Sequence, residues 1–336
     1  MAFSGDCAAI HRTRFLGTIV ATLALCACSP TPDGQVGPAP QPGQGGSADR
    51  EAGLGGGVGG GFGGSGGLSI AVDAAALSDA TSGCGSKKVT ALFVIDRSGS
   101  MKCNLPPTTS SQDCERTPER VDAVQPSKWE IVINVLSASF QQLVPKTADL
   151  TVRAGLSLFS VDDECGARSR PSVPLADMTA TQVDSLRQSL EITPAGGTPI
   201  VGAAILAYKH IYQPGFSGEG HVILLTDGAD SCKAAYDNSV GPGDHIAGLI
   251  DVEAPKALRL GIKTWVIGAP GSEPARHMLS NLARAGGTAR KDCDPGSPDN
   301  PESGNCHYDM TEGDFQLALQ KALEQIVTVV TCQPPQ

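Results

Sequence analysis

Short apolar runs alternate with amphipathic segments from residue 89 to the end of the chain. Three runs carry few polar side chains and are rich in β-branched residues, at residues 89–95, 221–226 and 262–268. Runs of this length and composition predict strands that are buried on both faces. Residues 150–160 instead alternate apolar with polar positions, which is typical of a strand with one exposed face.

Helical periodicity fills the segments between these strands. Apolar residues recur at three- and four-residue steps in residues 128–143, 179–191 and 315–330. Further helices are predicted to begin at Pro199, Pro255 and Pro274, because proline is favoured in a first helical turn. Thr311 with Asp314 resembles a capping box for the last helix. A short edge strand is expected near residues 288–289.

Strands that alternate with helices predict an α/β fold. We expect a Rossmann-like, doubly wound, mostly parallel central sheet with helices on both faces. This domain would span residues 84–332. Two polar, proline-containing insertions interrupt the pattern, at about residues 101–127 and 291–308.

The first 80 residues lack the pattern altogether. Arg12 and Arg14 precede an apolar stretch that is too short to span a bilayer, which predicts an export signal over residues 1–27. Leu-Cys-Ala-Cys-Ser at residues 25–29 resembles a bacterial lipobox with Cys28 as the acylated residue; an ordinary signal peptide with Cys28 unmodified is the alternative. Residues 28–80 are rich in proline and then glycine, which predicts a disordered tether.

These features predict an exported protein that is lipid-anchored in the cell envelope. Ser29 rather than Asp after the cysteine favours the outer membrane by the habit of such lipoproteins, and a secreted or periplasmic soluble protein is the alternative. The chain has a net charge of −10, which argues against nucleic acid or an anionic lipid surface as the main partner. Membrane contact is therefore expected only through the N-terminal lipid.

Cysteine usage agrees with export. Of 11 cysteines, Cys7 and Cys26 lie in the signal and Cys28 would carry lipid, which leaves eight. An even number in an exported chain predicts disulfides, and the absence of Cys-x-x-Cys argues against a thiolate metal site. From strand ends, helix direction and short separations, we predict the pairs Cys84–Cys332, Cys103–Cys114, Cys165–Cys232 and Cys293–Cys306.

The first buried run ends in Asp96, Ser98 and Ser100. Alternate positions of an extended chain point to one side, so a carboxylate and two hydroxyls would converge beyond the carboxyl end of a central strand. Open α/β sheets bind ligands there, and hard oxygen ligands suit Mg²⁺. The pattern alone is weak evidence, because Asp, Ser and Gly also form turns and caps.

Two distant residues add to this set. Asp227 directly follows the buried run at 221–226, and Thr198 precedes a helical pattern in Gly-Gly-Thr-Pro. Thr198 has a competing interpretation, as the N-cap of a helix with Pro199 in its first position. One hydroxyl can hardly cap a helix and ligate a cation equally well.

Together these five residues resemble the metal-ion-dependent adhesion site of the von Willebrand factor type A (VWA), or integrin I-like, domain. All five positions occur in the expected order, although the insertion at 101–127 is longer than that family usually shows. The resemblance implies that Ser98 and Ser100 ligate Mg²⁺ directly, with Mn²⁺ or Ca²⁺ as possible substitutes. It implies that Thr198, Asp96 and Asp227 complete the site, the acids often through water. It also implies a protein partner that presents an Asp or Glu to the metal.

Two other functions compete with adhesion. A Mg²⁺-dependent phosphoryl-transfer enzyme could use Asp96 as nucleophile, but the usual second acid two residues later is Ser98. No phosphate-binding Gly-x-x-x-x-Gly-Lys and no His-Glu-x-x-His is present, so we expect no enzyme. A structural envelope protein with an unused metal site is the remaining alternative.

Overall fold

The computed structural model describes residues 87–105, 111–160, 165–167, 169–232, 244–291, 293–294 and 305–331. All of them belong to one compact unit of the chain. The predicted signal, Cys28, the tether and the pair Cys84–Cys332 lie outside these residues.

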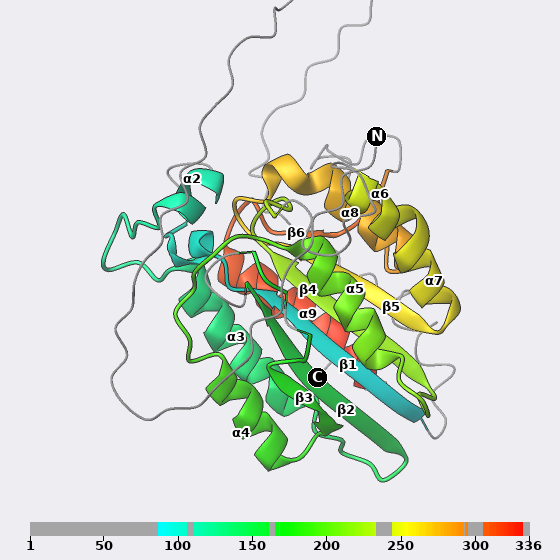
Figure 1. Cartoon of the computed structure of the whole chain (residues 1–336). Coiled ribbons are helices and arrows are strands. Elements are labelled where there is room, and N and C mark those ends of the chain that lie inside the picture. The colour runs from blue at the N-terminus through cyan, green and yellow to red at the C-terminus, as the bar shows by residue number, and fades with distance from the viewer. Residues whose placement is uncertain are drawn as a thin grey trace, which may run out of the picture. The chain divides into compact units, whose positions relative to one another are not determined.

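Within this part of the chain, the strands form one sheet of order β3-β2-β1-β4-β5-β6 (Figure 1). The strands are β1 (Lys87–Asp96), β2 (Leu150–Phe159), β3 (Val173–Asp177), β4 (Glu219–Thr226), β5 (Ile262–Gly268) and β6 (Tyr308–Asp309). All neighbouring pairs are parallel except β2 and β3, which are antiparallel. The carboxyl ends of the parallel strands therefore share one edge of the sheet.

Helices cover both faces of this sheet (Figure 1). One face carries α3 (Lys128–Gln142), α4 (Ala180–Ser189) and α9 (Phe315–Thr331). The other carries α5 (Ile200–Ile211), α7 (Ala254–Arg259) and α8 (Arg276–Ala285). Short helical segments complete the list: η1 (Gly99–Lys102), α2 (Ser111–Arg116), α6 (Asp244–Gly248), the π-helical η2 (Leu249–Glu253) and η3 (Glu273–Ala275).

The central strand β1 joins two hydrophobic cores. Its odd-numbered residues, such as Phe93 and Ile95, pack with α3 and α9, whereas Leu92 and Val94 pack against α5. This alternation follows from the two-residue side-chain period of a strand. It makes β1 buried on both faces, as its continuous apolar run predicts, and the α/β fold class is confirmed.

The edges of the sheet differ from the sequence-based prediction. β3 was not predicted, because Pro174 weakens its strand signal; its place at the sheet edge is one where proline is tolerated. The strand predicted near residues 288–289 is wrong. Thr288 instead closes the end of α8, donating its backbone N–H to Ala283 O (2.9 Å), and Tyr308 pairs with Ile267 as the edge strand β6.

Two predicted helix starts also move. The last helix begins at Phe315, and Asp314 caps it by accepting the Leu317 N–H (3.0 Å), so the capping box from Thr311 is wrong. Pro255 lies in the first turn of α7, as predicted, but helical structure already begins at Asp244, because α6, η2 and α7 are continuous. The π-helical turn ends at Glu253, two residues before Pro255, whose nitrogen has no hydrogen to donate.

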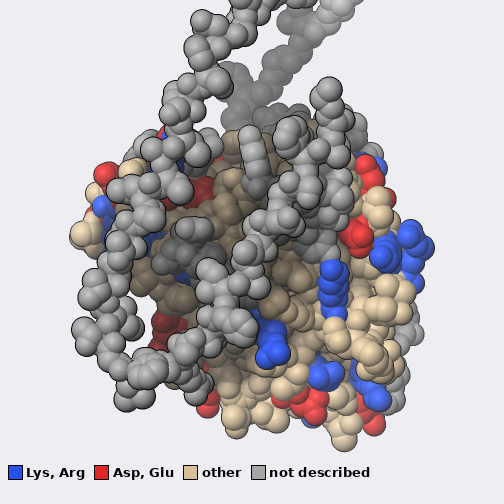
Figure 2. Space-filling model, viewed as in Figure 1, with Lys and Arg blue, Asp and Glu red and all other residues tan. Residues whose placement is uncertain are grey.

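Three disulfides join Cys103 with Cys114, Cys165 with Cys232, and Cys293 with Cys306. Each is one of the pairs proposed from the sequence. Disulfides persist in oxidising compartments, so they indicate an extracytoplasmic domain. None of the helices described is both long and apolar enough to cross a membrane. On the described part of the face in Figure 2, acidic and basic side chains lie scattered among uncharged ones.

Candidate metal centre

The site forms where the strand order reverses. β1 is followed in the chain by β2 on one side and pairs with β4 on the other, so the carboxyl ends of β1 and β4 are neighbours. Asp96 ends β1, and Asp227 directly follows β4. Side chains at such a switch point face the crevice in which open α/β sheets bind ligands.

Four of the five predicted residues meet in one buried cluster. The Ser98 and Ser100 hydroxyl oxygens lie 2.9 Å apart, and Ser100 donates to Asp227 Oδ1 (2.8 Å). Asp96 Oδ1 accepts the Ser98 backbone N–H (2.7 Å), and its Oδ2 accepts the Thr226 hydroxyl (2.7 Å). All four are at most 1% exposed. Four oxygen-bearing side chains are thus held together out of solvent.

Thr198 lies in a loop that is tied to this cluster. Gly99 N donates to Gly196 O (2.9 Å), and Ala195 N donates to Arg97 O (2.8 Å), which holds the two loops side by side. The Thr198 side chain is 2% exposed, and the partner of its hydroxyl is Glu115 Oε1 at 3.5 Å, not one of the other four residues.

The N-cap interpretation of Thr198 is wrong. Helix α5 begins at Ile200 with Pro199 in the cap position, and no side chain of that position caps it. Asp230 satisfies the first turn instead, because its Oδ2 accepts the Val201 N–H (2.9 Å). The Thr198 hydroxyl is therefore not used as a helix cap.

The structure adds a cation that sequence reasoning missed. Lys128 is fully buried at the start of α3; its ammonium bonds Asp227 Oδ2 and donates to Pro270 O (3.0 Å). Both carboxylate oxygens of Asp227 are thus engaged, one by Ser100 and one by Lys128. A signal was present, because a lysine in a first helical turn opposes the helix dipole and needs another reason to be there.

An acid from the insertion also reaches the rim. Glu115 of α2 is half-buried, and its Oε1 accepts the Ser231 hydroxyl (2.7 Å) beside Thr198. Ser111, at the other end of α2, donates to the backbone oxygen of Asp227 (2.7 Å). No periodicity in residues 101–127 predicted that this segment would pack on the site.

The cluster contains two carboxyl groups, Asp96 and Asp227, but one ammonium group, that of Lys128. Burial, and secondarily the charge of Asp227, raise the pKa of Asp96 to about 7, although hydrogen bonds from Ser98 and Thr226 oppose the shift. Burial also raises the pKa of Glu115. Lys128 pairs with Asp227 only, so Asp96 has no cationic partner of its own in the cluster. A cation would relieve this imbalance.

The donor set fits a hard divalent ion. It consists of hydroxyl and carboxylate oxygens, which Mg²⁺ prefers. No group of three His, Cys, Asp or Glu side chains suited to a metal occurs in the part of the chain described, so a cation here depends on the hydroxyls of Ser98, Ser100 and Thr198. Neutral hydroxyls leave a bound cation with positive charge toward a further ligand.

If the cluster binds Mg²⁺, the affinity should depend on pH through Asp96. Because its pKa is about 7 in the metal-free fold, binding must displace a proton below that pH, and we expect affinity at pH 6 to be about tenfold weaker than at pH 8. The metal-free protein should show the opposite trend, with stability falling as pH rises from about 4 to about 7, because folded Asp96 keeps a proton that the unfolded side chain has released. Calorimetric titration between pH 6 and 8 checks the first trend, and an unchanged affinity would contradict it.

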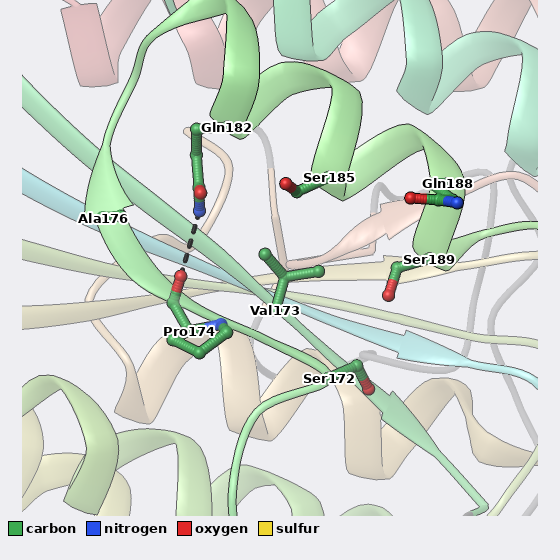
Figure 3. A pocket seen from close by; sticks show the side chains of 8 residues that line it. All are labelled: Ser172, Val173, Pro174, Ala176, Gln182, Ser185, Gln188 and Ser189. Carbon is green, nitrogen blue, oxygen red and sulfur yellow. Dashed lines mark hydrogen bonds between the residues drawn. The ribbon is translucent and has the colours of Figure 1, made fainter.

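A groove of about 580 Å³ lies elsewhere, between β3 and α4 (Figure 3). Its walls carry neutral side chains, among them Ser172, Ser185 and Gln188. Gln182 donates to Pro174 O (3.0 Å) across it and to Ala154 O (2.7 Å). The groove contains none of the five site residues and no titratable side chain, so it offers no comparable chemistry.

No protein-family model matches the chain, and no curated protein sequence matches it. Solved structures do resemble it. The pilus adhesin SpaC from Lactobacillus rhamnosus GG is 15% identical over 73% of this chain and 31% of that chain, with a TM-score of 0.49. The PilB minor pilin from Streptococcus sanguinis is 19% identical over 74% of this chain and 62% of that chain, with a TM-score of 0.45.

The SpRpn10 VWA domain is 11% identical over 71% of this chain and 95% of that domain, with a TM-score of 0.43. The likeness is one of fold. The described residues themselves form a mixed, mostly parallel sheet between two layers of helices. The match spans about a third of the length of SpaC.

Proposed function

We propose that this chain is a metal-dependent protein-binding domain of the cell envelope, which holds Mg²⁺ at the rim of its sheet and through it an acidic residue of a partner protein. The observation that carries the proposal is the buried cluster of Asp96, Ser98, Ser100 and Asp227, beside the loop of Thr198. Residues that cap helices bond to backbone groups nearby in the sequence, whereas Ser100 and Asp227 bond each other from the ends of two different strands.

Each residue has a part in this proposal. Ser98, Ser100 and Thr198 offer neutral oxygens, while Asp96 and Asp227 supply charge, directly or through water. A bound Mg²⁺ would provide a Lewis-acidic position for a carboxylate oxygen. Asp96 and Asp227 balance the charge of a divalent ion, and the Lys128 ammonium then leaves one positive charge in the cluster. An incoming Asp or Glu would neutralise it.

The geometry supports binding better than phosphoryl transfer. Both carboxylate oxygens of Asp96 already accept hydrogen bonds, from Ser98 N and from Thr226 Oγ1. These bonds fix the orientation of the carboxylate, and the position two residues later, where a phosphoryl-transfer site usually has its general acid, is Ser98. Asp96 is also fully buried, so a phosphate ester could reach it only if the surrounding loops moved.

The N-terminal part of the proposal concerns location. Acylation of Cys28 would tie the chain to a membrane, and residues 28–80 would act as a flexible tether for the domain. The three disulfides agree with such a location, since it lies outside the cytoplasm. Radiolabelled palmitate incorporation that is lost in Cys28→Ala tests the anchor.

Partner capture in the presence and absence of metal tests the binding function. The immobilised chain is incubated with envelope extract in Mg²⁺ or in chelator, and retained proteins are identified by mass spectrometry. We expect a protein that is retained in Mg²⁺, released by chelator, and not retained by Ser98→Ala/Ser100→Ala. Ser139→Ala is the matched control, because Ser139 is a buried serine of α3 whose hydroxyl donates to Val135 O (2.9 Å), within its own helix. Identical retention under all conditions would contradict the proposal.

A further inference from the structure

The insertion helix α2 contacts both loops of the metal centre. At one end, Ser111 donates to the backbone oxygen of Asp227 (2.7 Å). At the other end, Glu115 Oε1 accepts the Ser231 hydroxyl (2.7 Å) and lies 3.5 Å from Thr198 Oγ1. A segment that interrupts the strand and helix pattern is thus placed across the rim, with a carboxylate 3.5 Å from a predicted metal ligand.

The rim is shaped to let this helix approach. A Cβ atom at Gly99, between the two site serines, would lie 2.7 Å from the backbone oxygen of Glu115. A Cβ atom at Gly197 would lie 2.9 Å from Glu115 Oε1. Real Cβ atoms essentially never come so close to another heavy atom, so glycine at position 99 is needed for the backbone of Glu115 to approach the site. Gly197 also leaves room for the disulfide, because its Cβ would lie 2.9 Å from Cys232 Sγ.

Covalent and polar contacts hold Glu115 in this orientation. Its neighbour Cys114 is buried and bonded to Cys103, which directly follows the site turn η1. Arg116, the adjacent cation, pairs with Asp113 (3.2 Å) on the exposed side of α2. The carboxylate of Glu115 is directed to the hydroxyls of Ser231 and Thr198 instead.

The net charge of a metal-loaded cluster would favour an additional carboxylate. A divalent ion balanced by Asp96 and Asp227 leaves the positive charge of Lys128 uncompensated in a buried cluster. One further carboxylate would neutralise the site, and the chain carries one at its rim. A buried charge without a partner is costly, so this neutralisation favours a bound Glu115.

We propose that Glu115 is a built-in acidic ligand of the metal centre, which occupies the position of the partner's acid until the partner displaces it. This inference rests on the proposed function, since it assigns a regulator to the same site. It makes helix α2 a regulatory element of the site, because partner binding must exchange one carboxylate for another. Removal of the Glu115 charge should therefore weaken metal binding and open the site to external acids.

Mn²⁺ is a suitable probe, because its bound waters can be counted by electron–nuclear double resonance and by ¹⁷O water relaxation. The full chain is compared with Glu115→Gln, which keeps the side-chain size, and with Glu119→Gln, an exposed acid of the same insertion. We expect Glu115→Gln to bind Mn²⁺ about tenfold more weakly and to show one additional inner-sphere water. Millimolar acetate should then replace that water in Glu115→Gln but not in the wild-type chain or Glu119→Gln.

The outcomes separate this inference from the proposed function. Equal Mn²⁺ affinity and equal water count in wild type and Glu115→Gln would overturn the role of Glu115 and leave the metal site intact. Failure of every variant, including wild type, to bind Mn²⁺ would overturn both. Thermal unfolding in chelator should be the same for all three proteins, which shows that the substitution acts on the site and not on folding.

Discussion

Replacing Lys128 by methionine should destabilise the metal-free protein by about 3–5 kcal/mol, or lower its midpoint of thermal unfolding by about 10 °C. The substitution removes the ammonium that pairs with Asp227 and leaves two carboxylates buried without a cation. Mg²⁺ should recover most of this loss, because it would supply the missing positive charge. The gain in midpoint on adding Mg²⁺ should thus be larger in Lys128→Met than in wild type.

Differential scanning calorimetry in Mg²⁺ and in chelator measures both effects. Lys256→Met is the matched control, since Lys256 is 60% exposed and pairs with Glu253 at 3.7 Å on the surface. Exposed pairs contribute little, so the control should change stability by less than about 1 kcal/mol. A Lys128→Met protein that is equally destabilised in Mg²⁺ and in chelator would show that Lys128 is unrelated to a metal.

Asp227→Ala should have an effect of similar size that Mg²⁺ does not repair. It removes a carboxylate from the proposed metal site and leaves Lys128 as a fully buried, unpaired cation, for a loss of about 3–5 kcal/mol. Mg²⁺ binding, measured by titration calorimetry, should be abolished. Asp177→Ala serves as the control, because Asp177 is an exposed acid with only a distant pairing to Arg153 (3.8 Å).

The contrast between the two variants is informative in itself. If the site is only a structural ion pair, Lys128→Met and Asp227→Ala should respond identically to Mg²⁺. If it is a metal centre, only Lys128→Met is rescued. Substituting both residues together should restore part of the stability lost by either one, since no buried charge is then left without its partner.

Sequence patterns predicted the parts of this molecule that depend on local periodicity. The apolar run of β1 and the three-and-four spacing of α3 follow directly from burial on two faces or on one. The edge strands were not predicted from the pattern, because β3 contains Pro174 and β6 is two residues long. Neither has enough residues or a clean enough alternation to produce a signal.

The site was predictable only in part, for a similar reason. Asp96, Ser98, Ser100 and Asp227 follow buried strands, so topology alone brings them to one edge of the sheet. Lys128 and Glu115 belong to a helix start and to an insertion, whose positions depend on tertiary packing. They change the chemistry most, since one adds a positive charge to the site and the other adds a carboxylate at its rim.

A crystal structure of the chain grown with Mn²⁺, with anomalous data collected at the manganese edge, tests the central claim most directly. The account predicts one anomalous peak within about 2.3 Å of the Ser98 and Ser100 hydroxyl oxygens, with Asp96, Asp227 and Thr198 around it directly or through water. A peak elsewhere, or no peak while the Lys128 ammonium and the serine hydroxyls keep their present bonds, would contradict it.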